Sequence, residues 1–197
     1  MKRVLDKTYY NFDKKEIFKE VIIISLLSLL IPLLGGKIIS LIFGDTSVIS
    51  NNSNFIVGTI TTSLLIVSAL NLNGLKRVLL PIIMPGVGLI LSEVLFGTFN
   101  TEMLYLLPIL WLSNFAFVYL IKLLLLDKGL NYFLTLIVAL IVKICICFGI
   151  FYILNACGLF SHSDVDNIKY LIGAIEGIST FIGIFLGYII LTSYRLK

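Results

Sequence analysis

The chain has 197 residues, of which 59% are hydrophobic and 13% are charged, and its mean hydropathy is +1.08. An ordinary soluble domain has about 45–50% apolar and about 25% charged residues. So few charges cannot cover a globular surface, which excludes a cytosolic enzyme, a disordered tail and a nucleic-acid-binding module. The formal charge of +4 does not restore a nucleic-acid partner, because the basic residues stand at the ends of apolar segments. The composition predicts an integral membrane protein.

Six stretches are long and apolar enough to cross about 30 Å of hydrocarbon as helices of about 20 residues. In chain order they are 21–43, 55–72, 78–97, 103–126, 132–156 and 168–193. Residues 1–20 form a charged lead that lacks the small-residue cleavage site of a signal peptide. This segment either docks on the membrane surface as an amphipathic helix or forms a solvated anchor, and the sequence does not decide between the two. We therefore predict an all-α protein in which residues 21–197 form one six-helix transmembrane domain.

The distribution of Lys and Arg predicts how the helices are oriented. Of the 15 Lys and Arg residues, 12 fall on one side of the predicted membrane, whereas the loops 45–54, 98–102 and 157–167 on the other side have none. Cytoplasmic loops carry an excess of Lys and Arg. We therefore expect the N-terminus, the C-terminus and residues 1–20 in the cytoplasm.

Several kinds of chemistry lack their usual motifs. There is no Gly-x-x-x-x-Gly-Lys-Ser/Thr phosphate loop, so ATP-driven work would need another chain. Neither a Gly-x-Ser-x-Gly elbow nor a His-Glu-x-x-His helix is present, so we predict no enzymatic activity. Cys145, Cys147 and Cys157 are expected to be buried, inert thiols. His162 and its acidic neighbours fit a solvated outer loop better than a metal site, so we predict neither a metal nor a cofactor.

Four ionisable residues lie inside the predicted spans, where each costs about 2.5–3.5 kcal/mol to insert and marks a functional site by default. Counting from the predicted topology, Lys37, Glu93 and Glu176 lie in the outer half and Lys143 lies close to mid-depth. They could share one polar cavity that opens outward. Alternatively, they form structural ion pairs, such as Lys143 with Glu176, while Lys37 extends outward to the membrane surface.

Small and polar residues surround these charges. A stripe of small residues adjoins Glu176 and predicts close helix packing, so that this carboxylate faces protein. Its members are Gly173, Gly177, Thr180, Gly183 and Gly187.

The third and fourth predicted spans contain prolines, and the fourth also contains a tryptophan and an asparagine. Pro81 and Pro85 predict a kinked third span that either forms a cavity wall beside Glu93 or serves packing alone. Pro108, Trp111 and Asn114 are three residues apart, so we expect them on one helix face, where the indole and the amide either meet a planar ligand or serve packing. The hydroxyl cluster at 59–63 is expected mainly to bond to its own backbone.

Residues 55–185 resemble the substrate-binding S components of energy-coupling factor (ECF) transporters. The likeness is sharper with a branch of small bacterial membrane proteins labelled "iron hydrogenase". It rests on Val57–Ser63 at the start of the second span, on the inner-loop segment Leu75–Arg77 and on Leu106–Asn114, which is similar to Met-x-Pro-Phe-Ile-Trp-Leu-Gly-Asn. Lys143 matches an intramembrane lysine, and Glu176–Thr180 matches a Gln-x-x-Thr-like stretch.

The chain departs from this family at several positions. Thr62 stands where the family has Asn and Glu176 where it has Gln, so the ligand need not be the same. The first span lacks the Ala-x-x-x-Ala surface that S components offer their membrane partner. Three dispersed cysteines cannot hold the clusters of a hydrogenase, so that label has no chemical support.

The resemblance implies a subunit in a bacterial cell membrane that binds a small nutrient for uptake. It also implies an ECF-type coupling protein with two ATPases as separate chains, and a lid formed by residues 45–54. The expected partners are a small-molecule ligand and membrane lipid. The expected ligand-binding residues are Thr62, Glu93, Trp111, Asn114, Lys143 and Glu176.

Two other functions stay open. One is a structural or assembly subunit held by ion pairs. The other, less favoured, is an intramembrane enzyme that uses Glu93 or Glu176 as a base.

Overall fold

The computed structural model describes residues 2–8, 14–44, 47, 52–97, 102–161 and 165–195. Within these ranges no β-strand is present. Two segments, η1 and η2, are π-helical, with i→i+5 hydrogen bonds. In chain order the elements are α1 (Lys2–Leu5), α2 (Lys14–Phe43), α4 (Ser53–Asn71), α5 (Leu75–Phe96), α6 (Glu102–Ile121), η1 (Lys122–Asp127), α7 (Tyr132–Ala156), α8 (Val165–Tyr170), η2 (Leu171–Ile175) and α9 (Glu176–Arg195).

In the part of the chain that the structure describes, six segments are long and apolar enough to span a membrane. They are Ile17–Phe43, Ser53–Asn71, Leu75–Phe96, Leu104–Asp127, Tyr132–Ala156 and Val165–Ser193. Each coincides with one of the stretches predicted from the sequence. The all-α class and the six membrane-spanning helices are therefore confirmed, and the chain is a multi-pass membrane protein.

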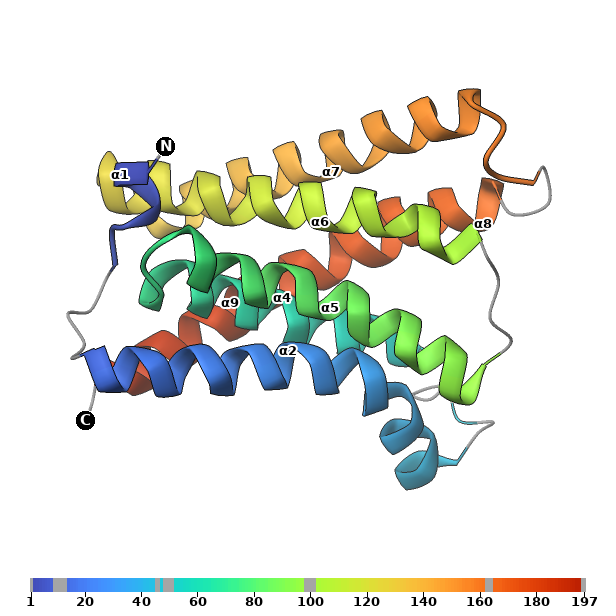
Figure 1. Cartoon of the computed structure of the whole chain (residues 1–197), viewed down its shortest axis with the longest axis horizontal. Coiled ribbons are helices and arrows are strands. Elements are labelled where there is room, and N and C mark those ends of the chain that lie inside the picture. Colours follow the sequence, from blue (N-terminus) through green and yellow to red (C-terminus); the bar gives the residue numbers. More distant parts are fainter. Residues whose placement is uncertain are drawn as a thin grey trace.

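The spans run side by side along the long axis of the molecule (Figure 1). Short connections make successive spans antiparallel. As a result, α1 and the last turns of α9 lie at the same end of the bundle, on the left in Figure 1. The start of α4, the end of α5 and the start of α6 lie toward the opposite end.

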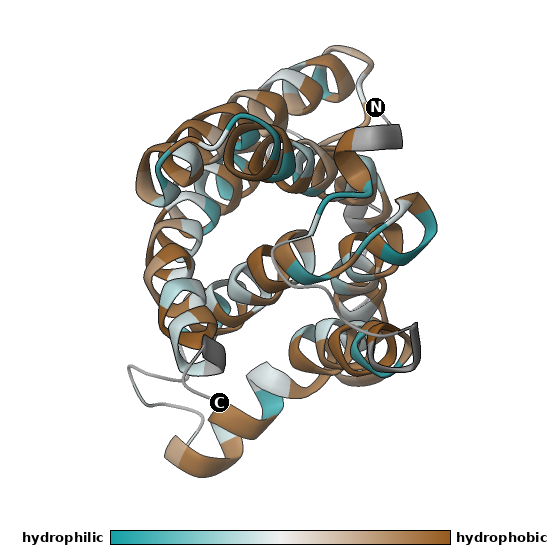
Figure 2. Cartoon of the chain, turned by 90° about the vertical axis from the view of Figure 1, so that its left-hand side faces the viewer, coloured by the Kyte–Doolittle hydropathy of each residue, from teal (hydrophilic) through white to brown (hydrophobic). Residues whose placement is uncertain are grey.

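The outer surface of the bundle is apolar, as a lipid-facing surface must be. Among the most exposed side chains are Leu41, Ile42, Leu95 and Ile153, all with more than half of their surface accessible. Hydrophobic colour dominates the helices in Figure 2. The exposed faces of the helices are therefore suited to contact with lipid.

Residues near the N-terminus pack on one end of the bundle. Leu5 is buried, and its carbonyl accepts a hydrogen bond from the backbone N–H of Gly74 at 3.0 Å. The buried Lys122 donates to the carbonyls of Lys7 at 2.6 Å and Leu72 at 2.7 Å. Lys122 is one of the 12 Lys and Arg residues that the sequence places on one side of the membrane. It is buried and satisfies the carbonyl of Leu72 at the C-terminal end of α4, which has no partner within the helix.

One helix boundary and the course of one span differ from the prediction. Helix α2 begins at Lys14, so the predicted boundary after residue 20 falls inside a continuous helix. The sixth span is interrupted by the π-turn η2 immediately before Glu176. A π-turn inserts one extra residue into a helix and shifts the faces on either side of it, and such turns are frequent at functional sites.

Helices α2 and α5 approach closely because α5 carries a glycine at the contact. A Cβ built on Gly88 would lie 2.4 Å from the carbonyl oxygen of Leu29 and 3.3 Å from Cβ of Pro32. By contrast, a Cβ on Gly149 of α7 would meet nothing within 4 Å. Beyond Pro32 and the Gly35–Gly36 pair, the last turns of α2 bend away from the bundle (Figure 1).

We predict that Gly88→Ala destabilises the bundle, because the added methyl collides with backbone that cannot rotate away. The expected loss in the free energy of unfolding is about 1–3 kcal/mol. Gly149→Ala is the matched control and should be neutral or stabilising by up to about 1 kcal/mol, as an open helical glycine predicts. Thermal unfolding of the purified proteins in detergent measures both, and equal effects of the two changes would contradict the close contact.

Candidate functional site

A cavity of about 230 Å³ lies inside the bundle, and every one of the six spans contributes to its wall. The contributing segments are Pro32 of α2, positions 54–65 of α4, 85–93 of α5, 106–114 of α6, 143–147 of α7 and 171–176 at the junction of η2 and α9. These segments belong to the half of the bundle away from α1 and the end of α9. The cavity is therefore a property of the whole bundle and not of one helix pair.

Most of the cavity wall is apolar. Pro85, Leu89 and Ile90 of α5 line it together with Leu107 and Leu110 of α6. Ligand pockets for drug-sized molecules have about 300–1,000 Å³, whereas an apolar cavity of about 150 Å³ holds benzene. A volume of 230 Å³ thus suits a small molecule of roughly one ring with substituents.

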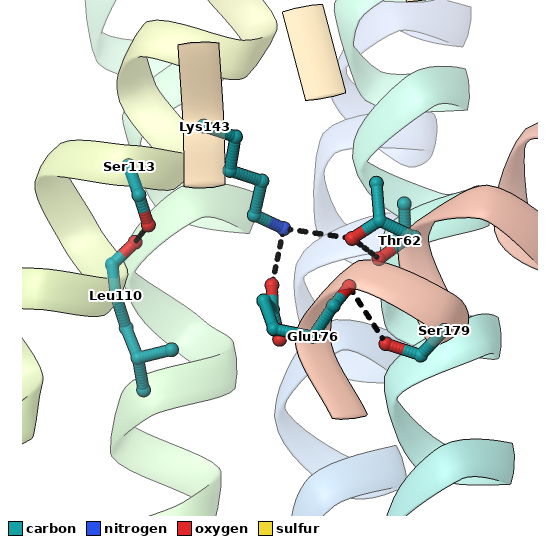
Figure 3. Close-up of polar contacts among 7 residues, drawn as sticks. Thr62, Leu110, Ser113, Lys143, Glu176 and Ser179 are labelled. Carbon is teal, nitrogen blue, oxygen red and sulfur yellow. Dashed lines mark hydrogen bonds and ion pairs between the residues drawn. The ribbon is translucent and has the colours of Figure 1, made fainter. Parts of the chain in front are cut away.

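An ion pair between Lys143 of α7 and Glu176 of α9 lies on the cavity wall (Figure 3). Lys143 is 1% exposed and Glu176 is 21% exposed. The ammonium also donates to Oγ1 of Thr180 at 3.4 Å and lies 5.2 Å from the centre of the Phe117 ring. The lysine is therefore neutralised by a carboxylate and further stabilised by a hydroxyl and an aromatic face.

This arrangement combines the two interpretations of the sequence. Lys143 and Glu176 form an ion pair across successive spans, as the structural interpretation expected. Both residues also line the cavity. The ammonium of Lys143 is buried and already paired. The carboxylate of Glu176 is only partly buried, so part of its surface stays accessible for contact with a ligand.

Thr62 extends the polar network to α4. Its Oγ1 lies 3.4 Å from Oγ1 of Thr180, and it also lines the cavity. Thr180 belongs to the stripe of small residues and was missed as a site residue, although its spacing from Glu176 by one helical turn was a usable signal. The two hydroxyls link the ion pair to the wall that α4 provides.

Two buried polar groups on the cavity wall lack a hydrogen-bond partner. They are Oδ1 of Asn114, whose residue is only 4% exposed, and Oγ1 of Thr61. A buried polar atom without a partner costs about 1–3 kcal/mol. In a cavity wall, such atoms indicate that a bound molecule or water completes them.

Glu93 lies on the cavity wall toward the end of α5. Within the described residues no cation pairs with it, since the ion pairs found join other residues. Lys37 of α2 is exposed, and its ammonium lies 5.8 Å from the centre of the Phe96 ring, three residues after Glu93 in α5. Lys37 does not line the cavity.

Trp111 takes a supporting position and is not among the residues that line the cavity. Its indole N–H donates to the carbonyl of Ile83 in α5 at 3.1 Å, and Gly86 leaves room for the ring. A Cβ on Gly86 would lie 2.7 Å from the indole nitrogen. Trp111 therefore fixes α6 against the proline-containing part of α5.

The shared face expected for Pro108, Trp111 and Asn114 is not formed. Pro108 is exposed, Trp111 contacts α5 and Asn114 lines the cavity. A helix turns by about 100° per residue, so each step of three residues falls about 60° short of a full turn. Over two such steps the direction drifts by about 120°, which separates the proline from the amide.

The stripe of small residues packs against two helices. A Cβ on Gly177 would lie 3.4 Å from Ile144 of α7, whereas a Cβ on Gly183 would lie 2.9 Å from the carbonyl of Thr59 in α4. The packing role predicted for the stripe is therefore confirmed. The close approach of α9 to α4 also brings Thr180 to Thr62.

Two further predictions concern the hydroxyl cluster and the thiols. Ser63 bonds to the carbonyl of Ile60 at 2.7 Å, as expected for the hydroxyl cluster. The expectation of buried thiols is wrong for Cys145 and Cys157, which are exposed, and right for Cys147. Cys145 lies on the lipid-facing side of α7, and Cys157 caps the end of that helix.

The described residues contain no group of three or more His, Cys, Asp or Glu side chains that could hold a metal. His162 and Asp164 lie outside the described residues, as does most of the expected lid at 45–54.

No protein-family model matches the chain, and neither does any curated protein or solved structure.

The buried ion pair predicts a specific pattern of stabilities. Lys143→Met leaves the Glu176 carboxylate without its cation and should lower the free energy of unfolding by about 3–5 kcal/mol. The double variant Lys143→Met/Glu176→Leu removes both charges and should recover most of this loss. Thermal unfolding in detergent compares the stabilities of the wild type, the single variant and the double variant, each measured separately.

Lys169→Met is the control, since Lys169 pairs with Asp166 at 3.1 Å on an exposed surface and should cost less than about 1 kcal/mol. A double variant as unstable as Lys143→Met alone would contradict the pairing.

Proposed function

We propose that the chain is a substrate-binding membrane subunit, similar in role to the S components of ECF transporters. The observation that carries this proposal is the cavity inside the bundle, with the unpartnered amide oxygen of Asn114 and hydroxyl of Thr61 on its wall. A bundle that served packing alone would fill this space with side chains. Instead, six spans converge on a small space that is mostly apolar and carries a few polar groups, as ligand sites do.

The proposed orientation places both chain ends in the cytoplasm. Lys and Arg gather at the end of the bundle that carries α1, and cytoplasmic loops carry such an excess. In this orientation the cavity belongs to the outer half of the membrane, which suits a molecule that enters from outside a bacterial cell.

The energy for uptake would come from separate chains. The sequence has no phosphate loop of its own. The resemblance to S components supports an ECF-type coupling protein with two ATPases as the partner set.

A structural or assembly subunit is the second candidate, and the ion pair between Lys143 and Glu176 is the observation that favours it. For such a subunit the cavity would have no occupant. Replacing both charges together would then leave function intact, whereas a binding subunit would lose ligand.

Native mass spectrometry of the chain purified from its host tests the proposed function. We expect a bound small molecule in the wild-type protein and its loss in Asn114→Leu, which removes the unpartnered amide oxygen and narrows the cavity. Asn167→Leu is the matched control, because Asn167 is exposed in α8 outside the cavity. A wild-type protein without a bound molecule, or equal retention by Asn114→Leu, would contradict ligand binding at this site.

A further inference from the structure

Polar side chains from three spans meet at the inner end of the cavity, the end toward the middle of the bundle. Helices α6 and α9 run in one direction along the bundle, and α7 runs in the opposite direction (Figure 1). The last cavity residues of α6 and α9 therefore lie toward the same end as the first cavity residue of α7. These residues are Asn114, Glu176 and Lys143.

Contacts between side chains support this placement. The ammonium of Lys143 pairs with Glu176 and lies 5.2 Å from the centre of the Phe117 ring in α6. Phe117 follows Asn114 by three residues, which is just under one turn of a helix. Asn114 therefore lies within about one helical turn of the ion pair.

The inner end of the cavity carries no net charge. Lys143 and Glu176 neutralise each other there. The other charged residue of the described cavity wall, Glu93, lies at the opposite end, where its carboxylate is beside Gly97 after the last turn of α5. A charged group placed beside the ion pair would find no free opposite charge, and burying such a group is costly. The inner end therefore suits an uncharged group.

The hydrogen-bond acceptors at the inner end lack donors. Oδ1 of Asn114 is buried without a partner. The carboxylate of Glu176 is 21% exposed, and an ionised carboxylate only accepts. The ammonium of Lys143 is 1% exposed and already donates to Glu176 and Thr180. A ligand that completes these acceptors therefore has to supply an N–H or O–H donor.

The wall outward from Asn114 restricts the body of the ligand. Leu107 and Leu110 of α6 and Ile172 and Ile175 of η2 give it an apolar surface. The volume of about 230 Å³ limits the ligand to roughly one ring with substituents. An apolar ring therefore fits outward of the polar end.

We propose that the cavity binds an uncharged ring molecule that carries an N–H or O–H donor, with the donor on Oδ1 of Asn114 and the ring against the apolar wall of α6 and η2. This inference rests on the proposed function and specifies its substrate class. It goes beyond the resemblance, which leaves the ligand open.

Four planar probes of nearly equal size and shape test the proposal. Benzamide is uncharged and has an N–H donor, acetophenone is uncharged and has none, benzoate is an anion and benzamidinium is a cation. Their binding to the full chain in lipid nanodiscs is measured by isothermal titration calorimetry at pH 7, with empty nanodiscs as the reference for partition into lipid. We expect benzamide to bind at least about tenfold more tightly than each of the other three, as one completed buried hydrogen bond predicts.

Two variants locate the preference. Asn114→Ala removes the acceptor without narrowing the cavity, so benzamide should bind about tenfold more weakly and acetophenone should change by less than about twofold. Asn167→Ala is the matched control, because Asn167 is exposed outside the cavity, and it should change neither probe by more than about twofold. Thermal unfolding shows whether both variants are folded. A preference for benzamide that survives in folded Asn114→Ala would overturn the placement of the donor on Asn114.

The possible failures are distinguishable. Acetophenone binding as tightly as benzamide would overturn the donor, and benzoate or benzamidinium binding as tightly would overturn the uncharged class. Both results leave the proposed binding function standing. If no probe binds, the molecule retained by the chain purified from its host decides: an uncharged molecule with a donor supports the proposal, and a charged one overturns it. An absence of probe binding together with an empty purified protein would overturn both proposals.

Discussion

A cation buried inside a membrane-spanning bundle needs a partner within that bundle, and Lys143 imposes this requirement on the present fold. The lysine is 1% exposed and pairs with Glu176. The pair draws α7 and α9 together, and Thr180 connects it to Thr62 of α4. Because an unpaired charge would be far costlier here than in water, these helices are expected to keep one arrangement. The same network leaves part of the Glu176 carboxylate facing the cavity.

Glycines and a π-turn in the backbone determine how closely the helices pack around the cavity. Glycines at positions 86, 88 and 183 let helices approach where a Cβ would meet a side chain or a carbonyl at under 3.0 Å. The π-turn η2 rotates the start of the sixth span, so that residues 171, 172, 175 and 176 reach the cavity. Close packing around a space that stays open is consistent with a site, since interiors otherwise fill to high density.

Hydropathy was sufficient to predict the six spans, and the charges inside them gave the pairing of Lys143 with Glu176 as one of two alternatives. Both follow from one dominant cost, namely that of polar groups in hydrocarbon. The face of each helix was harder to predict. Trp111 turns toward Ile83 and not into the cavity, because a three-residue spacing drifts around a helix. Lys122 is buried against the carbonyls of Lys7 and Leu72, contacts that depend on how residues near the N-terminus fold back. The π-turn has no reliable sequence signal at all.

The most direct measurement is an experimental structure of the chain purified from its native membrane, at a resolution that shows bound small molecules. A ligand-binding subunit predicts non-protein density in the cavity, in contact with Asn114. A cavity closed by rearranged side chains, or occupied by a lipid acyl chain that leaves the Asn114 amide unpartnered, would contradict the proposed function.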